Sequence, residues 1–181
     1  MKLIIASDIH GAAGFCRRLL AAWDLEKASR LLLLGDILYH GPRNDLPEGY
    51  NPKAVISLLN DRRSDILCVR GNCDTEVDQM VLQFPILADY AYLLIDELRI
   101  LATHGHVYNA EHLPPLQPEE ILIHGHTHIP AWEPLGNNLI LNPGSVSIPK
   151  NQSPHSYMTL EKGLFLWKTL EGEIFHSLQL P

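Results

Sequence analysis

The sequence lacks long hydrophobic runs. Runs of consecutive apolar residues are short, as at Leu31 to Leu34, whereas a transmembrane helix needs about 20 apolar residues. We therefore expect no membrane-spanning helix and no membrane partner. The segment Met1 to Ser7 reaches the charged residue Asp8 before it could form the apolar core of a signal peptide. From this we expect a cytoplasmic protein.

Basic charge is also scarce. Fourteen Lys and Arg residues stand against 21 Asp and Glu residues, which gives a net charge of −7. Such a chain is a poor binder of nucleic acid, because neutralising phosphates requires a basic footprint. We therefore expect no stable nucleic-acid binding. Two bound divalent cations would add +4, leaving about −3 overall and a local positive centre.

Cysteine is sparse as well. The three cysteines, Cys16, Cys68 and Cys73, are odd in number and form no CxxC pair. This excludes a disulfide framework and disfavours a closed zinc site built from thiolates. The 46% hydrophobic and 19% charged residues are near globular averages, and a length of 181 residues predicts a single domain over residues 1–181.

Apolar runs alternate with segments of helical periodicity in the first half of the chain. The patterns predict helices at 12–27, 51–59 and 75–83, a short helical turn at 118–120, and strands at 3–6, 31–34, 66–69, 90–95, 99–103, 121–124, 139–141, 157–160, 164–169 and 174–178. An α/β first half followed by a β-rich second half indicates an α/β protein with two sheets packed face to face and helices outside.

Polar residues of the kinds that bind metals follow five of the predicted strands. Because ligands bind beyond the carboxyl ends of strands in open α/β sheets, we expect these clusters to meet at one edge. The residues are Asp8, His10, Asp36, Asn72, His104, His126 and His128.

The mixture of carboxylate, carboxamide and imidazole groups suits Mn, Fe, Zn or Ni better than Ca or Mg. Alone, an Asp-x-His or a Gly-Asp after a strand is usually a cap or a turn. Five such clusters in one small domain favour a shared metal site over unrelated turns. His40 and His106 lie near the same predicted edge, whereas His112, His155 and His176 are expected at the surface.

The order of these motifs resembles the signature of the calcineurin-like metallophosphoesterases. The motifs are Asp8-x-His10, Gly35-Asp36, Gly71-Asn72, His104 and Gly125-His126-x-His128. Within that superfamily, Gly71-Asn72-Cys73-Asp74 and the stretches 40–44 and 142–146 resemble the YfcE-type bacterial phosphodiesterases. The resemblance implies a metallophosphoesterase-like four-layer αββα sandwich, in which two mixed sheets pack face to face between outer helices.

The resemblance also implies two divalent metal ions per chain. Asp8, His10, Asp36 and His128 would hold the first ion, and Asp36, Asn72, His104 and His126 the second, with Asp36 as the bridge. Mn²⁺ is the expected metal, and Zn²⁺, Ni²⁺ and Fe remain open. Cys73 stands where many relatives have His, which leaves open whether the thiol is a general acid, a nucleophile or only fills space.

The expected activity is hydrolysis of phosphodiester bonds by in-line attack of a metal-bridging hydroxide. The expected catalytic residues are Asp36, Asn72, His104 and, with its role open, Cys73. Arg43, His40 and His106 are the expected substrate contacts. A preference for diesters follows from the resemblance and from Arg43 being the one obvious cation near the predicted edge, since monoesters carry more charge.

Two other functions remain open. One is a phosphomonoesterase or nucleotide phosphatase on the same fold. The other is a non-catalytic, metallophosphoesterase-like binding scaffold, although scaffolds tend to lose ligands and every expected ligand position is filled here. We expect a small phosphodiester or nucleotide as the substrate and allow for a homo-oligomer.

Overall fold

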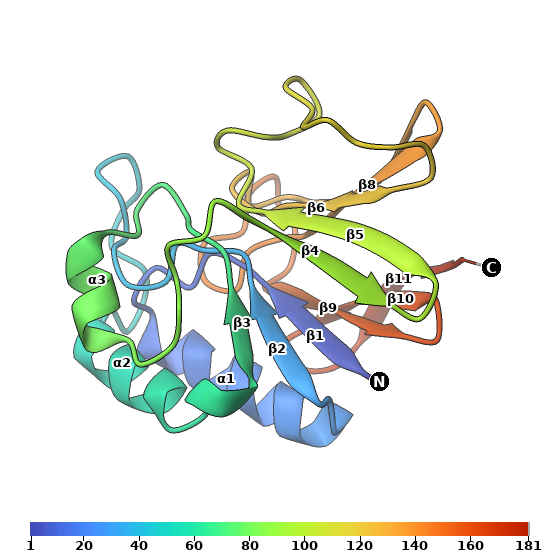
Figure 1. Cartoon of the computed structure of the whole chain (residues 1–181). Helices are drawn as coiled ribbons and strands as arrows, with labels where there is room; N and C mark the ends of the chain where they lie inside the picture. Colours follow the sequence, from blue (N-terminus) through green and yellow to red (C-terminus); the bar gives the residue numbers. More distant parts are fainter. Residues whose placement is uncertain (181) are drawn as a thin grey trace.

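Two mixed β-sheets pack face to face in the computed structural model, which describes residues 1–180 (Figure 1). The six-stranded sheet has the order β11-β10-β9-β1-β2-β3, and the five-stranded sheet has the order β4-β5-β6-β8-β7. The strands are β1 (Leu3–Ala6), β2 (Arg30–Leu33), β3 (Ile66–Cys68), β4 (Tyr90–Ile95), β5 (Leu98–Thr103), β6 (Ile121–Ile123), β7 (Pro130–Leu135), β8 (Asn138–Pro143), β9 (Ser156–Glu161), β10 (Leu164–Thr169) and β11 (Ile174–Gln179).

Each sheet contains three parallel strands. β1, β2 and β3 run parallel in the six-stranded sheet, and β9 joins β1 in the antiparallel direction. In the five-stranded sheet, β5, β6 and β8 run parallel, with β4 and β7 as antiparallel edges. The five strands that precede the predicted metal ligands are therefore neighbours within their sheets: β1, β2 and β3 in one, and β5 and β6 in the other. Parallel neighbours end at the same edge of a sheet, as the prediction of one shared site requires.

The helices are α1 (Ala13–Glu26), α2 (Pro52–Asn60) and α3 (Glu76–Val81), with a 3₁₀ turn at Arg63–Asp65. α1 and α2 cover the outer face of the six-stranded sheet, where Leu19 and Val55 pack against strand residues such as Ile4 and Leu31 (Figure 1). α2 begins as its sequence predicts. Pro52 is the first helical residue, and the Asn51 side chain accepts a hydrogen bond from the backbone N–H of Ala54.

A second apolar core lies between the two sheets. Alternate residues of each strand point into it, so Ile5 and Leu32 from one sheet meet Ile100 and Ile123 from the other. Trp167 is fully buried there, and its indole N–H donates to the backbone oxygen of Asn142 at 2.7 Å. This bond ties the six-stranded sheet to the end of β8.

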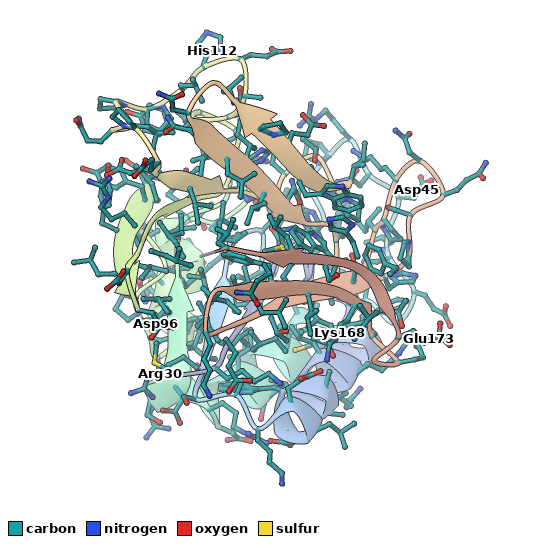
Figure 2. The ribbon with its side chains drawn as sticks, turned by 90° about the vertical axis from the view of Figure 1, so that its right-hand side faces the viewer. Arg30, Asp45, Asp96, His112, Lys168 and Glu173 are labelled. Carbon is teal, nitrogen blue, oxygen red and sulfur yellow. The ribbon has the colours of Figure 1, made fainter. Side chains whose placement is uncertain are left out.

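The α/β sandwich of two mixed sheets is confirmed, but its two outer faces differ. The helices of residues 1–180 accompany the six-stranded sheet. On the other face, Leu101, Leu122 and Ile140 form a small cluster covered by Leu116 from the segment between β5 and β6. That segment contains no helix, and the expected helical turn at 118–120 is an ordinary turn. Figure 2 shows His112 on this segment, far from α1, and at the surface as expected.

β7 is the strand that the sequence patterns did not predict. Pro130 and Pro134 lie within it, and proline interrupts a typical strand pattern. It is tolerated here because β7 is an edge strand that pairs with β8 alone. The other predicted helices and strands are present, with ends that differ by one or two residues.

The last hairpins are anchored on α1. The Lys168 ammonium of β10 contacts the Glu26 carboxylate at 2.5 Å, and the Tyr157 hydroxyl donates to the same carboxylate at 3.0 Å. Figure 2 shows Lys168 between the β9–β11 ribbon and α1. Among the described residues, no helix is both long and apolar enough to cross a membrane.

Candidate metal centre

The backbone is strained at the loops where the predicted ligands lie. Asp8, His10, Asp36, His126 and His128 have φ angles of 61°, 49°, 55°, 66° and 62°. Residues other than glycine rarely adopt this left-handed conformation, and such strain concentrates at functional sites. It turns the side chains out of their strand directions and toward one another.

Asp8, His10 and His128 form the first ligand set. The Nε2 atoms of His10 and His128 lie 3.7 Å and 3.3 Å from Asp8 Oδ1 and 3.4 Å from each other. All three side chains are buried. Asp8 Oδ1 is buried without a hydrogen-bond partner, although buried carboxylate oxygens are normally satisfied.

The second set consists of Asp36, Asn72, His104 and His126. His104 Nε2 lies 3.4 Å from Asp36 Oδ2, 3.2 Å from Asn72 Oδ1 and 3.2 Å from His126 Nδ1. Asp36 Oδ2 also lies 3.7 Å from Nε2 of His10 in the first set. Asp36 is therefore the carboxylate that stands between the two sets.

Backbone carbonyls fix the orientation of three imidazoles. The Nδ1 atoms of His10, His104 and His128 lie 2.7, 2.6 and 2.6 Å from the carbonyl oxygens of Tyr39, Leu34 and Ile148. A carbonyl can only accept, so each Nδ1 carries a proton and donates it. In the neutral ring, Nε2 then presents a lone pair to the centre, which is the arrangement that metal-binding histidines use.

The donor atoms fit divalent cations. The lone pairs of His10 and His128 face each other and an unpartnered oxygen of Asp8 across less than 4 Å. Without a cation or a proton between them these atoms repel. A cation satisfies all three at once, and the O/N donors suit the borderline transition metals.

The pKa shifts in the second set show that the nearby carboxylates stabilise one positive charge, on His104. Burial alone raises the pKa of Asp36, but the His104 hydrogen bond and charge hold that pKa well below its usual range. Burial lowers the pKa of His104, yet Asp36 and Asp8 outweigh it and raise the pKa to about 9. Burial and the charge of His104 lower the pKa of His126 to about 4. A metal ion entering this set competes with the proton on His104.

Asp74 holds two of the ligand loops together, a role that the sequence analysis missed. Its buried carboxylate accepts the backbone N–H groups of Asp36, Ile37 and Gly71 at 2.8, 2.9 and 2.7 Å. Burial and the Asp36 charge raise the pKa of Asp74, and these N–H donors oppose the shift. The sequence signal that could have marked Asp74 is its position directly after Gly71-Asn72-Cys73, at the end of a strand that carries a predicted ligand.

Ser145 and Ser147 hold the Asp8 loop. Their hydroxyls donate to the Asp8 backbone oxygen at 3.1 and 2.8 Å. Asn142 donates to the backbone oxygen of Gly125 at 2.9 Å and so positions the loop that carries His126. The stretch 142–146, noted in the sequence only for its resemblance to a subgroup, therefore buttresses two ligand loops.

Two glycines permit the close approach of these loops. A Cβ on Gly71 would meet Asp36 Oδ1 at 2.1 Å, and a Cβ on Gly125 would meet Ser7 Oγ at 1.9 Å. Either side chain would push a ligand loop out of place.

A cleft of about 430 Å³ opens over the centre. It is lined by ligands of both sets and by Arg43, Cys73 and Lys150. Arg43 therefore lies where the sequence analysis placed it. The expectation that Arg43 is the one cation at this edge is wrong, because Lys150 lines the same cleft. No strand-end pattern marked Lys150, which lies on the loop between β8 and β9.

The two other expected substrate contacts lie beside the cleft. His106 is exposed, with ring centroids 5.4 Å from His104 and 6.2 Å from His126. His40 packs edge-on against Tyr39 and Tyr50. Neither is among the residues that line the cleft.

Cys73 lies against the centre. Its thiol and one ligand atom each of His10 and Asp36 lie within 4.8 Å of one another. Its backbone N–H donates to Asp36 Oδ1 at 2.8 Å. Burial, followed by the Asp36 charge, raises the pKa of the thiol well above its usual range, so the neutral thiol is the favoured form.

Comparison with known proteins identifies the family. The model of the calcineurin-like phosphoesterase superfamily domain matches residues 1–162. The chain belongs to this superfamily. It is 48% identical over 161 residues to phosphodiesterase YfcE of Escherichia coli K12, an alignment that covers 89% of this chain and 88% of YfcE.

Solved structures agree. A structure described as YfcE, a phosphoesterase from E. coli, superposes with a TM-score of 0.96 at 44% identity and covers 100% of both chains. Vps29 of Entamoeba histolytica, in a structure described as its complex with Zn²⁺, gives a TM-score of 0.62 at 19% identity and covers 98% of both chains. This second likeness shows the fold alone.

The comparisons confirm the predicted superfamily and the resemblance to YfcE. The protein is a metal-dependent phosphodiesterase homologue of the phosphoric diester hydrolase class. Its family implies divalent metal ions, and the His and Asp groups described above are suited to bind them.

Proposed function

We propose that the protein is a dinuclear-metal phosphodiesterase whose centre consists of the two ligand sets bridged by Asp36. The observation that carries the proposal is the pair of facing donor sets, one of which contains the unpartnered buried oxygen of Asp8. Asp8, His10, Asp36 and His128 would hold one ion, and Asp36, Asn72, His104 and His126 the other. Mn²⁺ is the proposed metal, with Zn²⁺, Ni²⁺ and Fe as alternatives.

Two divalent ions held by these residues would supply a hydroxide near neutral pH for in-line attack and would offset charge on the phosphoryl oxygens. The chain's own residues position the substrate. Arg43 and Lys150 attract the phosphate from the cleft wall, and exposed His106, whose ring lies beside those of His104 and His126, is a further proposed contact. Asn72 and His104 are held together by the 3.2 Å contact between them.

Substrate preference tests the proposal. We expect a higher kcat/KM for bis(4-nitrophenyl) phosphate than for 4-nitrophenyl phosphate. Because both Arg43 and Lys150 line the cleft, a shortage of cations does not explain a preference for diesters. The expected preference rests on the similarity to YfcE. A higher specificity constant for the monoester would favour the phosphomonoesterase alternative and overturn the diesterase proposal.

Lys150 provides a prediction about binding. Lys150→Ala is expected to raise KM for aryl diesters about 5-fold with little change in kcat, because an exposed cation contributes about 1 kcal/mol to anion binding. Steady-state kinetics at low ionic strength measure this effect. Lys162→Ala, in the turn between β9 and β10, is the matched control. Equal KM values for the two variants would remove Lys150 from the substrate site.

Cys73 provides a second prediction. Because nitrophenolate is a stable leaving group that needs almost no proton, Cys73→Ser is expected to keep its metal and lose less than about tenfold in kcat on aryl diesters. Loss of a general acid typically costs about 10²–10⁴-fold. A loss of that size with metal content intact, by elemental analysis, would make the thiol catalytic.

The scaffold alternative draws on the fold shared with Vps29. Complete ligand sets favour the enzyme.

We further propose one domain over residues 1–181, supported by β10 and β11, which lie beyond the matched residues 1–162 and extend the same sheet. The proposed substrate is a small phosphodiester or nucleotide, in a cytoplasmic protein with no stable nucleic-acid or membrane partner. Assembly into a homo-oligomer remains open to measurement.

A further inference from the structure

A second hollow of about 360 Å³ lies next to the metal cleft. Tyr39 and Tyr50 line one part of it, and residues of α2 and α3 line the rest. Cys73 lines both this hollow and the metal cleft. Cys73 therefore stands between the two spaces, beside the position where a phosphoryl group would lie. We call this space the apolar hollow.

One face of each helix supplies the apolar lining. Ile56 comes from α2, and Val77 and Val81 come from α3, where their spacing of four residues places the two valines on one helical face. Val77 is 68% exposed and Val81 is 42% exposed. Apolar side chains gathered at the rim of a catalytic cleft and left open to water are typical of a ligand site.

Hydrogen bonds connect this hollow rigidly to the metal ligands. His10 Nδ1 donates to the carbonyl oxygen of Tyr39 at 2.7 Å, and the backbone N–H of Cys73 donates to Asp36 Oδ1 at 2.8 Å. The His40 ring packs edge-on between Tyr39 and Tyr50 and so helps to fix both tyrosines. A group in the hollow is therefore held in a defined position relative to the centre.

Charge and size indicate the occupant. The lining carries one cation, Lys53, and one anion, Asp78, so it favours no net charge. Its volume is near the lower end of the roughly 300–1,000 Å³ typical of small-molecule sites, which suits one ring system. Tyrosine rings stack on planar groups.

Resting on the function proposed above, we propose that the apolar hollow binds an uncharged aromatic ring on the ester arm that stays on the phosphate. Negative charge develops on the oxygen of the other arm as it leaves. That oxygen is better stabilised among the cations Arg43 and Lys150 of the cleft than beside an apolar wall. The retained arm therefore lies in the hollow, and aryl diesters and nucleoside diesters are the two substrate classes that fit.

Kinetics with a common leaving group test the inference. Wild-type protein is expected to prefer 4-nitrophenyl phenyl phosphate over 4-nitrophenyl methyl phosphate by about 10-fold or more in kcat/KM. Val77→Asp places a charge in the hollow and is expected to reduce this preference to about 2-fold. Met80→Asp is the matched control, because Met80 is 84% exposed on the same helix and does not line the hollow; its preference should equal that of the wild type.

A binding measurement is independent of turnover. In the Zn²⁺-loaded protein, the ring protons of saturating phenylphosphonate are expected to show nuclear Overhauser effects to the methyl groups of Ile56, Val77 and Val81. Contacts to other methyl groups, or none, would overturn the inference. Thymidine 5′-(4-nitrophenyl phosphate) distinguishes the two classes, since a nucleobase arm that fits should again lose its advantage in Val77→Asp but not in Met80→Asp.

The inference and the proposed function fail in different ways. If the metal-loaded wild type hydrolyses neither ester, the proposed function is wrong. If the wild type hydrolyses both esters and Val77→Asp keeps the wild-type ratio of kcat/KM between them, only the inference is wrong. An equal loss of kcat/KM on both esters is one such result, because it leaves the ratio unchanged. Equal metal content in the two variants, by elemental analysis, excludes an indirect effect on the centre.

Discussion

Removal of divalent metal is expected to reduce hydrolysis of bis(4-nitrophenyl) phosphate by at least about 10³-fold. Stabilisation of transition-state charge by metal ions is worth several kcal/mol, and each 1.36 kcal/mol changes the rate tenfold. The Cys73 thiol beside the centre cannot replace them in the metal-free protein, because burial and the Asp36 charge raise its pKa and keep it neutral. Dialysis against a chelator, then titration with Mn²⁺, Zn²⁺, Ni²⁺ and Fe²⁺, measures the loss and its recovery, and we expect Mn²⁺ to restore the most activity.

Thermal unfolding provides a readout that does not depend on catalysis. The facing donors of Asp8, His10 and His128 repel in the metal-free protein. Metal at 100 times its Kd is therefore expected to stabilise the fold by about 2.7 kcal/mol, which raises Tm by about 5–10 °C for a chain of this length. Full activity after chelation, with metal shown to be absent, would contradict the prediction.

The candidate ligands could be predicted because their signals are local. Each ligand follows an apolar run that reads as a strand, and parallel strands in one sheet end at the same edge. The same reasoning located α2, whose cap at Asn51 and first-turn Pro52 are written in adjacent residues. Patterns of this kind can be recognised from neighbouring residues alone, without the tertiary contacts of the fold.

Features that depend on tertiary contacts could not be predicted. β7 contains two prolines and is a strand only because it is an edge. Asp74 accepts the N–H groups of Asp36 and Ile37, which lie 38 and 37 residues earlier in the chain, and Lys150 reaches the cleft on the loop between β8 and β9, which has no strand-end pattern. The apolar hollow needs α2, α3 and Tyr39 to be brought together. Each of these features depends on contacts made only in the folded chain.

Asp36→Asn is expected to lose at least one of two bound metal ions and at least about 10²-fold in activity. Asp36 Oδ2 is the oxygen shared by both ligand sets, 3.7 Å from His10 Nε2 and 3.4 Å from His104 Nε2. The substitution replaces a charged oxygen with an N–H donor, which cannot bind a cation. The metal-free variant should still fold with a near-normal Tm, because the remaining amide oxygen can accept the Cys73 backbone N–H as Oδ1 does now.

Asp74→Asn is the control that separates a ligand from a structural carboxylate. Asp74 is as buried as Asp36, but its two oxygens are occupied by three backbone N–H donors. An amide nitrogen in place of either oxygen leaves N–H groups facing one another, at a cost of about 1–3 kcal/mol for each unsatisfied group. We therefore expect Asp74→Asn to lower Tm and, once folded, to bind as much metal as the wild type. Elemental analysis and thermal unfolding of both variants measure the two effects, and two metal ions with normal turnover in Asp36→Asn would show that Asp36 is not the bridge.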